Sequence, residues 1–358
     1  MQATSAEPRM ATSAQLEIIR VEQPGVAHAW EEFVQREASA TSYHRWGWKQ
    51  VMERAFGWPT FYLLARQGDQ VTGVLPLVWQ KSLLFGSFLT SLPFLNGGGI
   101  VARDPAVARS LLQAAIRLAD ELGVQHLELR QRTQPDWDLP TRTHKVALLC
   151  ELEPDADRRF ASLPHKVRTD IRKSMSYGLT AEFGGRELLE AFYGVFSRNM
   201  RDLGTPVYSR SFFEQILAAF PQESFICVVR HNGAPIAGSF LTAFRDTVEA
   251  GWSASLYAYL HMKPNMFLYW SILAEMGRRG YRWFDFGRST VGSGTYRFKK
   301  QWGTMEQPLY WSYWTRAGEP LPALSPENPR YRLAIRLWQK LPLAVTNCLG
   351  PRIVRCLP

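Results

Sequence analysis

Residues 62–73, YLLARQGDQVTG, have a counterpart in residues 227–238, CVVRHNGAPIAG. In each segment an apolar run leads into a polar turn that contains a glycine, Gly68 or Gly233, and a second run follows. Two short runs joined by such a turn are typical of a β-hairpin. The sequence therefore predicts the same hairpin twice, once in each half of the chain.

The elements around the two hairpins also repeat. Two predicted helices precede each antiparallel meander, and a third helix and a further strand follow it. The third helix is predicted at residues 105–122 in the first half and at residues 265–279 in the second, and each ends at a glycine, Gly123 or Gly280. We therefore infer an internal duplication of one α/β unit. This order of elements predicts an α+β mixed sheet with helices on its faces.

The duplication predicts two domains of similar size. The first is expected at residues 16–152 and the second at residues 153–315. Residues 1–15 have no hydrophobic signal core and are expected to be a disordered lead. Residues 316–358 form a basic, amphipathic C-terminal tail.

The composition restricts the class of protein and of partner. The chain has 358 residues, of which 46% are hydrophobic, and Lys+Arg 42 against Asp+Glu 32 gives a net charge of +10. This excess favours an anionic partner, such as a nucleic acid, a nucleotide-linked substrate or a membrane surface. The four cysteines show no CxxC spacing, so we expect reduced thiols, no metal site and a cytoplasmic location. No apolar run is long enough to span a bilayer.

Residues 281–303, YRWFDFGRSTVGSGTYRFKKQWG, give the strongest indication of a site. Asp285 lies in an apolar run that predicts a buried strand ending at Gly287, and a buried acid is costly without a partner. Arg288 and Lys299 follow, and such cations suit an anion or developing negative charge. Because the equivalent strand of the first half lacks the RFKKQWG extension, we expect the second half to carry the chemistry. The structural alternative is a β-hairpin in which Asp285 forms a salt bridge.

A basic helix is predicted between the two halves, at residues 163–179. Its apolar residues recur at helical spacing, and Lys166, Arg168 and Arg172 cover the other sides. One interpretation is a solvated linker helix. The functional interpretation is a basic helix that lines a cleft between the domains, where substrates often bind.

The C-terminal tail contains a predicted amphipathic helix at residues 329–341. Arg336 and Lys340 lie on one stripe, and Leu337 and Trp338 lie on another. Such a helix either docks on the body of the protein or lies on an anionic membrane, which would place the protein at the inner face of the membrane.

Three segments resemble a known family: KVRTDIRKSMSYGL at residues 166–179, FDFGRS…GTYRFKKQWG at residues 284–303 and NPRYRLAIRLWQKLPL at residues 328–343. They are similar to FemAB-type transferases and the related CelD-like acyltransferase domain. The chain most resembles the FemAB-type proteins that accompany exosortase (PEP-CTERM) and exopolysaccharide gene clusters. The resemblance covers about residues 16–315 and implies two tandem GNAT domains, which have the fold of acyl-CoA N-acyltransferases.

The resemblance also implies an activity. The family's best-known members transfer an amino acid from aminoacyl-tRNA to an amine of a peptidoglycan precursor. By this likeness the chain is expected to be an N-acyl or aminoacyl transferase of cell-envelope biosynthesis, acting on an anionic peptidoglycan or exopolysaccharide precursor. The expected co-substrate is an aminoacyl-tRNA or an acyl-CoA, with no tightly bound cofactor. The expected partners are the precursor, tRNA where it is the donor, and a membrane surface that the tail contacts.

Individual residues follow from the same likeness. Phe298 and Lys299 match the family's Phe-Lys pair near the active site, where the lysine is thought to stabilise charge at the reacting carbonyl. Arg168 and Arg172 match its basic interdomain helix. The family's usual Gly-Gly after the strand is replaced here by Gly287 followed by an arginine.

The remaining candidates follow from residue type and position. His44, Tyr208 and Tyr269 suit a glycan or peptide groove or, alternatively, a packed core, and Asn265 can cap the helix that follows it. The segment NGGG at residues 96–99 suits a phosphate-binding loop. Because no Ser/His/Asp or Cys/His arrangement is present, we expect direct transfer without a covalent enzyme intermediate, with Asp285 as a base or as an orienting group. The rival hypothesis is a non-catalytic scaffold protein of an exopolysaccharide or exosortase system.

Overall fold

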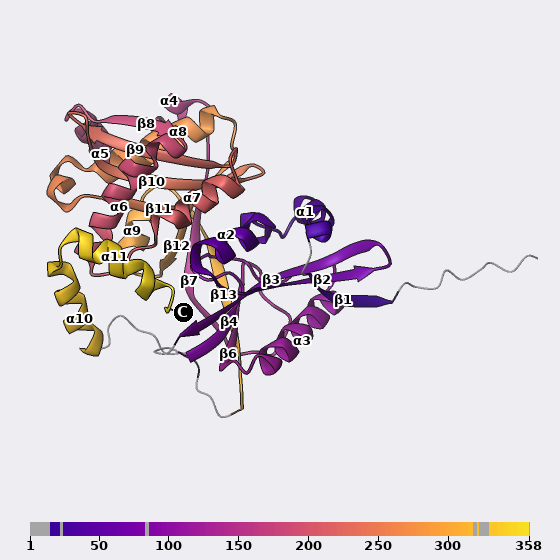
Figure 1. The fold of residues 1–358 in the computed structure, drawn as a ribbon. Helices are drawn as coiled ribbons and strands as arrows, with labels where there is room; N and C mark the ends of the chain where they lie inside the picture. The colour runs from indigo at the N-terminus through magenta and orange to yellow at the C-terminus, as the bar shows by residue number, and fades with distance from the viewer. Residues whose placement is uncertain (1–14, 22–23, 83–85, 318–320, 322–328, 358) are drawn as a thin grey trace, which may run out of the picture.

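The computed structural model describes residues 15–21, 24–82, 86–317, 321 and 329–357. Two α/β units lie side by side, and a single mixed sheet runs through both of them (Figure 1). In the described part of the chain this sheet has 13 strands in the order β1-β2-β3-β4-β6-β13-β7-β12-β11-β10-β9-β8, with β5 paired to β3. The predicted fold class, a mixed sheet built from a duplicated unit, is confirmed. Most of the predicted disordered lead, residues 1–14, lies outside the described residues.

The first unit contains the elements predicted around the first hairpin. Its bounds are β1 (Leu16–Val21), η1 (Pro24–Val26), α1 (Ala27–Arg36), η2 (Ser42–His44), α2 (Gly47–Phe56), β2 (Thr60–Gln67), β3 (Gln70–Ser82), β4 (Gly86–Thr90), β5 (Val101–Ala102), α3 (Pro105–Glu121), β6 (His126–Gln131) and β7 (Thr141–Glu151).

The second unit repeats this order. Its bounds are α4 (Ala156–Ser162), α5 (His165–Met175), β8 (Thr180–Gly184), η3 (Arg186–Leu188), α6 (Leu189–Leu203), α7 (Arg210–Ala219), β9 (Ser224–His231), β10 (Ala234–Phe244), β11 (Thr247–Ser255), η4 (Tyr257–Met262), α8 (Pro264–Arg278), β12 (Trp283–Thr290), α9 (Gly294–Lys300) and β13 (Met305–Thr315). Two helices of the C-terminal tail follow, α10 (Pro329–Lys340) and α11 (Leu343–Val354). No helix of the described residues is both long and apolar enough to cross a membrane.

The two units exchange their last strands. β7 follows β6 in the chain, yet it pairs with β12 of the second unit and with β13. β13 follows β12, yet it pairs with β6 of the first unit. Each unit therefore completes the sheet of the other, and the junction between the units is continuous hydrogen-bonded sheet.

Side-chain packing joins the units as well. One buried cluster contains residues of both units, including Trp48 of α2 and Phe220 beside α7, whose ring centroids are 5.3 Å apart. A second cluster lies between α8 and the strands of the second unit, and a third lies between α3 and the strands of the first. Burial of apolar surface is the main stabilising term in folding, so the shared cluster makes the two units one body.

The parallel strands β11 and β12 separate after a short contact. They share only three residue pairs, from Thr247↔Trp283 to Glu249↔Asp285. Beyond this point the register of β12 against β7 shifts between Asp285 and Arg288. Gly287, at the shift, has φ +73, a left-handed conformation that a side chain disfavours. The two strands therefore diverge and leave a gap in the sheet.

Two local predictions for residues 281–303 are wrong. The strand was expected to end at Gly287, but β12 continues through the irregularity to Thr290 because its far side still pairs with β7. The β-hairpin given as the structural alternative for this segment is not formed either, because the cationic run forms the helix α9. Ser293 initiates this helix, since its Oγ accepts a hydrogen bond from the Tyr296 amide.

Candidate active site

A cavity of about 270 Å³ lies where β11 and β12 separate. We call it the central cavity. Both strands line it, through residues 250–253 of β11 and residues 286–288 of β12. Its other walls come from α6, α9 and the first unit, and its polar lining side chains are Tyr43, Asn96, Tyr208, Ser253, Arg288 and Lys299. Residues of both units and of the predicted catalytic segment thus meet in one hollow.

Two cations in the central cavity have no carboxylate partner among the described residues. Lys299 of α9 donates to the backbone oxygens of Gly287 and Arg288, at 3.2 and 3.0 Å. An ammonium group has three donors, so one N–H remains for a ligand. Burial lowers the pKa of Lys299 to about 8, against the raising effect of nearby Asp285 and Glu249.

Arg288 is the second of these cations. Its guanidinium lies over the ring of Trp311 at 5.3 Å, and its Nη1 is buried without a hydrogen-bond partner among the described residues. Burial and the neighbouring Arg130 both lower the pKa of Arg288. A buried cation without a counter-charge is costly unless a ligand supplies one. The central cavity is therefore suited to an anion.

An ion cluster lies behind the central cavity. Arg132 follows β6 of the first unit and reaches into the second, where its Nη2 is 2.7 Å from Asp285 and 3.6 Å from Glu249. All three side chains are buried or nearly so, and Asp285 is only 1% exposed. Asp285 also accepts a hydrogen bond from the Gly287 amide at 2.7 Å, which fixes the irregular turn of β12. We call Arg132, Asp285 and Glu249 the ion cluster.

Glu249 connects the ion cluster to the central cavity. Its Oε1 accepts from the Asn96 amide at 2.7 Å, and its carboxyl also shares a hydrogen bond with the Tyr43 side chain. Both partners line the central cavity. Burial, and then the charge of Asp285, raise the pKa of Glu249 to about 7, while Arg132 opposes the shift. A carboxyl with this pKa is suited to accept a proton near neutral pH.

Glu249 and Asp285 also border a second cavity, of about 180 Å³, together with Arg132 and Thr41. Neither carboxyl lines the central cavity itself. The ion cluster therefore separates two hollows, and the Tyr43 phenol and the Asn96 amide both line the central one and contact Glu249.

The structure places Lys299 and Arg288 together, as the sequence predicts, but it gives Asp285 a different neighbour. Asp285 forms its ion pair with Arg132 and makes no hydrogen bond or ion pair with either predicted cation. Tyr208 lines the central cavity. Tyr269 and Phe298 do not line it, because they pack with Phe286 and Trp302 on the α8 side of β12.

The predicted basic helix, α5, lies against α8 in the second unit. Lys166, Arg168 and Arg172 do not line the central cavity, and Arg172 lies over the ring of Phe160 at 5.0 Å. Asn265 does not cap α8, because the chain enters that helix one residue earlier, through Lys263 with φ 57 and Pro264 as the first helical residue. Lys263 pairs with Asp170 of α5.

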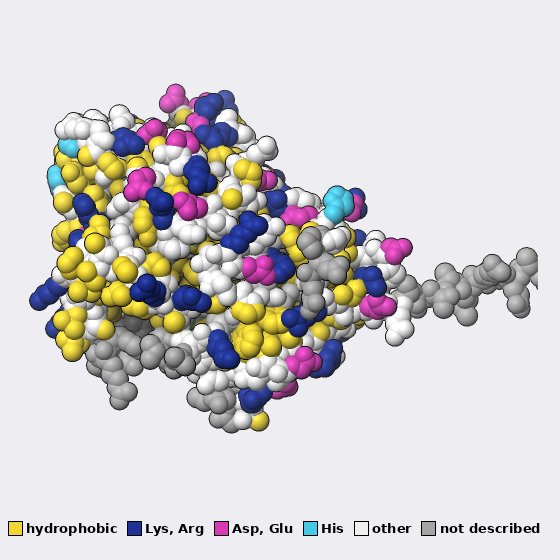
Figure 2. Space-filling view, in the orientation of Figure 1, with side chains coloured by type: hydrophobic (Ala, Val, Ile, Leu, Met, Phe, Trp, Pro, Cys, Tyr) yellow, Lys and Arg dark blue, Asp and Glu magenta, His cyan; other side chains and the backbone are white. Residues whose placement is uncertain are grey.

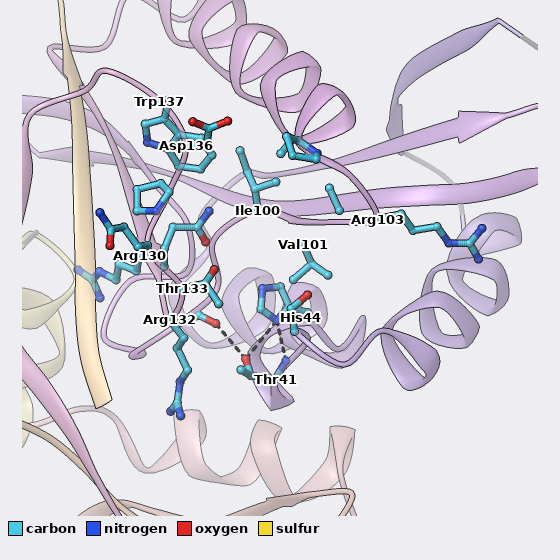
Figure 3. Close-up of a pocket in the computed structure, with 18 of the residues that line it drawn as sticks. Thr41, His44, Ile100, Val101, Arg103, Arg130, Arg132, Thr133, Asp136 and Trp137 are labelled. Atoms are coloured by element: carbon cyan, nitrogen blue, oxygen red, sulfur yellow. Dashed lines mark hydrogen bonds between the residues drawn. The ribbon is translucent and has the colours of Figure 1, made fainter. Parts of the chain in front are cut away.

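His44 lies at the edge of another cavity, of about 250 Å³, in the first unit (Figure 3). Its Nδ1 contacts the Thr41 amide at 3.0 Å, and its Nε2 contacts the Gly99 oxygen at 3.0 Å. Burial lowers the pKa of His44 to about 4, so the ring is neutral and donates from Nε2 to Gly99. Figure 3 shows Arg132 extending away from this cavity. His44 therefore fixes local structure, while its neighbour Tyr43 faces the central cavity.

His44 predicts a pH dependence of stability. Its pKa in the folded state, about 4, is below the ordinary 6.5, so the unfolded state binds more protons between these values and stability falls as the pH falls. Replacing His44 with glutamine removes this contribution. The stability advantage of the wild type over His44→Gln is expected to shrink by up to about 3 kcal/mol between pH 7 and pH 4.

Urea denaturation of both proteins across this pH range measures the difference. The wild type must be compared with the variant at each pH because protonation of Glu249 raises the stability of both proteins as the pH falls through the same range. Substitution of the exposed His28 of α1 serves as the control for the loss of a histidine outside the buried site. If the difference in free energy of unfolding between the wild type and His44→Gln did not change with pH, the assignment of a buried neutral ring would be contradicted.

The glycine run at residues 97–99, which follows Asn96, does not form an open phosphate loop. Thr41 donates to the Gly97 oxygen at 2.9 Å, and the Gly99 amide donates to the Arg130 oxygen at 2.9 Å. A Cβ at Gly99 would lie 2.8 Å from that oxygen, so the glycine is required by close backbone approach. Within the described residues, no group of three or more His, Cys, Asp or Glu side chains is placed to hold a metal ion.

Four residues of the site were missed from the sequence: Tyr43, Asn96, Arg132 and Glu249. Glu249 had a signal, because it is an acid inside the apolar run of β11, as Asp285 is in β12. Asn96 precedes the glycine run, and Tyr43 precedes the candidate residue His44. Arg132 had no local signal, since its role depends on a strand pairing across the two units.

Comparisons with known proteins agree with this architecture. The model of an acetyltransferase (GNAT) domain matches residues 165–300. No curated protein sequence matches the chain significantly. Among solved structures, FemX superposes with a TM-score of 0.64 at 13% identity, covering 82% of this chain and 96% of FemX.

Two further structures are similar. The C-terminal domain of an Agrobacterium fabrum protein assigned as a lysylphosphatidylglycerol synthetase gives a TM-score of 0.55 at 13% identity, covering 81% of this chain and 92% of that domain. A tandem GNAT protein from the clavulanic acid biosynthesis pathway gives a TM-score of 0.52 at 13% identity, covering 86% of this chain and 100% of that protein. At such identities the likeness establishes the fold. Residues 165–300 therefore match the model of an acetyltransferase (GNAT) domain, and the chain as a whole has the fold of two GNAT-like units in tandem.

Proposed function

We propose that this chain is an N-acyl or aminoacyl transferase that acts on an amine of an anionic cell-envelope precursor. The observation that carries the proposal is the content of the central cavity. It combines two cations that have no carboxylate partner in the described part of the chain, Arg288 and Lys299, with a phenol that contacts a carboxyl of raised pKa. Acyl transfer to an amine needs a stabiliser for the oxyanion and an acceptor for the amine proton, and these groups can supply both.

The proposed reaction is a direct transfer. The lone pair of a neutral amine attacks the carbonyl carbon of the donor and forms the C–N bond, and the carbonyl oxygen becomes an oxyanion that the Lys299 ammonium stabilises. The amine proton passes through the Tyr43 hydroxyl to Glu249. Collapse of the tetrahedral intermediate breaks the C–O or C–S bond to the donor, and the leaving oxygen or sulfur takes a proton from Lys299 or water. No enzyme side chain forms a covalent bond.

The gap between β11 and β12 supports binding of an extended donor or acceptor. Residues 250–255 of β11 pair with β10 on one side, while their parallel pairing with β12 has already ended. Backbone groups on this side of β11 can therefore bind amide groups of a ligand, as at any open strand edge. Both an acyl-CoA and the acyl end of an aminoacyl-tRNA are compatible with this geometry.

The acceptor class is proposed from charge and from one structural neighbour. Arg288 lies beside Tyr208 in the central cavity and suits a phosphate or carboxylate of the acceptor. The Agrobacterium fabrum neighbour is named for lysylphosphatidylglycerol, an aminoacylated anionic lipid. Amine-bearing peptidoglycan and exopolysaccharide precursors are the acceptors to test first, with phosphatidylglycerol, which offers only hydroxyl groups, as a comparison.

The first experiment is mass spectrometry of small molecules and RNA that co-purify with the full chain, followed by transfer assays with the donor found. Bound CoA or charged tRNA identifies the donor, and a nucleotide-linked or lipid-linked precursor identifies the acceptor. The proposal fails if neither donor class supports transfer to any amine-bearing anionic acceptor; that result favours a binding or scaffold role.

Substitutions of the two cations are expected to separate their roles. Lys299→Met should lower kcat by about 10²–10³-fold because it removes a donor to the oxyanion. Arg288→Ala should mainly raise KM for the acceptor, by about tenfold or more, because it removes a charge-assisted contact. The matched control is Lys300→Met, since Lys300 is exposed and pairs with Glu306 outside the cavity. Equal kinetics for Lys299→Met and Lys300→Met would contradict the assigned role.

A further inference from the structure

The positive charge of the chain is concentrated at its C-terminal end. Residues 329–358 contain six Lys and Arg residues and no Asp or Glu. The preceding 328 residues therefore have 36 Lys+Arg against 32 Asp+Glu and are close to neutral. The charge that the composition shows is thus a local property of the helices α10 and α11, rather than of the body.

The inner sides of these two helices are docked on the body. Ile335 of α10 lies against Gly204, and Gln339 donates to the Asp202 oxygen at 2.9 Å. In α11, Val354 belongs to the buried cluster that both units share. Gln80 of the first unit donates to the Leu357 oxygen at 3.1 Å, just beyond α11. The two helices are therefore held in a fixed orientation, as the prediction that the tail docks on the body of the protein requires.

The outer side of α10 is apolar and basic. Leu333 and Leu337 are 64% and 58% exposed, although both are large hydrophobic residues on an ordered helix. Arg336 and Lys340 are exposed on the same side of the helix as these two leucines. No carboxylate of the described residues forms an ion pair with either cation, so both charges face outward.

The outer side of α11 continues this character. Val345, Leu349 and Ile353 recur four residues apart, and each is more than a third exposed. Arg352 is exposed beside them. Figure 2 shows hydrophobic side chains gathered over α10 and α11, at the left edge of the molecule, with Lys and Arg among them. We call the exposed residues of both helices the tail face: Leu333, Arg336, Leu337, Lys340, Val345, Leu349, Arg352 and Ile353.

We propose that the tail face binds the surface of a bilayer that contains anionic phospholipids. Helices that lie in a membrane interface combine a large apolar stripe with basic residues, because the apolar side chains enter the headgroup region while the cations meet lipid phosphates. The tail face has both properties and lacks acids, which an anionic surface would repel. Charge complementarity therefore selects an anionic bilayer over an acyl-chain pocket of neutral character or a second, equally basic copy of this chain.

The position of the tail face gives this binding a consequence. α6 contacts α10 at its C-terminal end, and Met200 of the same helix lines the central cavity. Leu203, between these two points, is 60% exposed. A bilayer on the tail face would thus lie next to one wall of the central cavity. This consequence, unlike the binding itself, rests on the proposed function and suggests an acceptor that is anchored in lipid.

Vesicle flotation with the full chain tests the proposal. The protein is expected to float with vesicles of phosphatidylglycerol and phosphatidylcholine, to bind vesicles of phosphatidylcholine alone much more weakly, and to be released by raised salt. Charge reversal in Arg336→Glu/Lys340→Glu should weaken binding at least about 30-fold, since each cation near an anionic surface contributes about fivefold. Leu333→Glu/Leu337→Glu should weaken it at least about tenfold.

The controls use exposed residues elsewhere on the second unit. Lys173→Glu on α5 repeats one of the two charge reversals, and Tyr257→Glu/Leu260→Glu on η4 repeats the replacement of two exposed apolar residues. Both should retain binding, and all variants should keep the wild-type melting temperature. Failure of the wild type to bind, equal binding by tail-face and control variants, or a dimer that Leu333→Glu/Leu337→Glu dissociates without any vesicle binding would each overturn the proposal. Because no turnover is measured, these outcomes do not depend on the transferase hypothesis.

Discussion

Replacement of Arg132 with methionine is expected to lower the free energy of unfolding by about 3–5 kcal/mol at pH 8, the range found when one partner of a buried ion pair is removed. Arg132 is the one cation that forms ion pairs with Asp285 and Glu249 among the described residues. Methionine fills a similar volume but cannot compensate either carboxyl. The same substitution should disorder the turn at Gly287, because Asp285 orients that turn through its amide.

The loss should depend on pH in a defined direction. Without Arg132 nothing opposes burial and the charge of Asp285, so the pKa of Glu249 in the folded variant rises further above that of the unfolded chain. The folded variant then binds more protons than the unfolded one, and its stability falls as the pH rises. The deficit relative to the wild type should therefore be smaller at pH 5 than at pH 8.

Urea denaturation at both pH values measures this deficit. The control is Arg109→Met, because Arg109 pairs with Asp136 at 2.8 Å on an exposed surface. That pair is expected to contribute at most about 1 kcal/mol. If Arg132→Met were no more destabilising than Arg109→Met, or if its deficit grew toward pH 5, the ion cluster would not hold the two units together as described.

The duplicated unit could be predicted from the sequence because its signals are local. Each hairpin is specified by a turn glycine between two apolar runs, and each long helix ends at a glycine. The exchange of β7 and β13 could not be predicted. Both are ordinary apolar strands, and their choice of partner depends on contacts more than a hundred residues away along the chain, which no local pattern encodes.

Some residues of the candidate site could likewise be predicted from local sequence, and others could not. Asp285 was found because a charge in an apolar strand is conspicuous, and Lys299 was found through a resemblance that includes its neighbour Phe298. Arg132 was missed because it lies two residues from Arg130, which is neutralised within its own strand by Glu128 at 2.5 Å. Arg132 reaches Asp285 only because the sheet is continuous across the two units.

The two units also differ at equivalent positions. In the first unit the parallel strands β4 and β6 end their pairing at Thr90↔Glu128, which corresponds to Glu249↔Asp285 in the second. The gap beyond Thr90 is filled by the chain itself, since Arg130 donates to the Leu95 oxygen at 2.9 Å and Leu95 is buried. The equivalent gap of the second unit remains a cavity. The first unit thus has a closed copy of the site and contributes Arg132, Tyr43 and Asn96 to the open one.

Replacement of Glu249 with glutamine is expected to lower kcat by about 10²–10⁴-fold, the usual contribution of a general base. Glutamine can keep hydrogen bonds to Asn96 and Tyr43 but cannot accept the amine proton. In the wild type the rate should rise with pH through about 7, because Glu249 must be ionised to act as the base. The rate of Glu249→Gln should lack this rise. Glu182→Gln, which alters an exposed ion pair on β8, should leave both the rate and its pH profile unchanged.

The stability of Glu249→Gln should change in the opposite direction from its activity. The pKa of Glu249 is about 7 in the folded state and 4.5 without the fold, so the folded protein binds more protons and loses stability as the pH rises through this range. Glutamine removes that loss, and the variant should be more stable than the wild type at pH 8, by up to about 3 kcal/mol. A variant that is inactive and also less stable at pH 8 would indicate a structural role for Glu249. An inactive variant that is more stable would show a group kept in the fold for its chemistry, at a cost in stability that Arg132 only partly offsets.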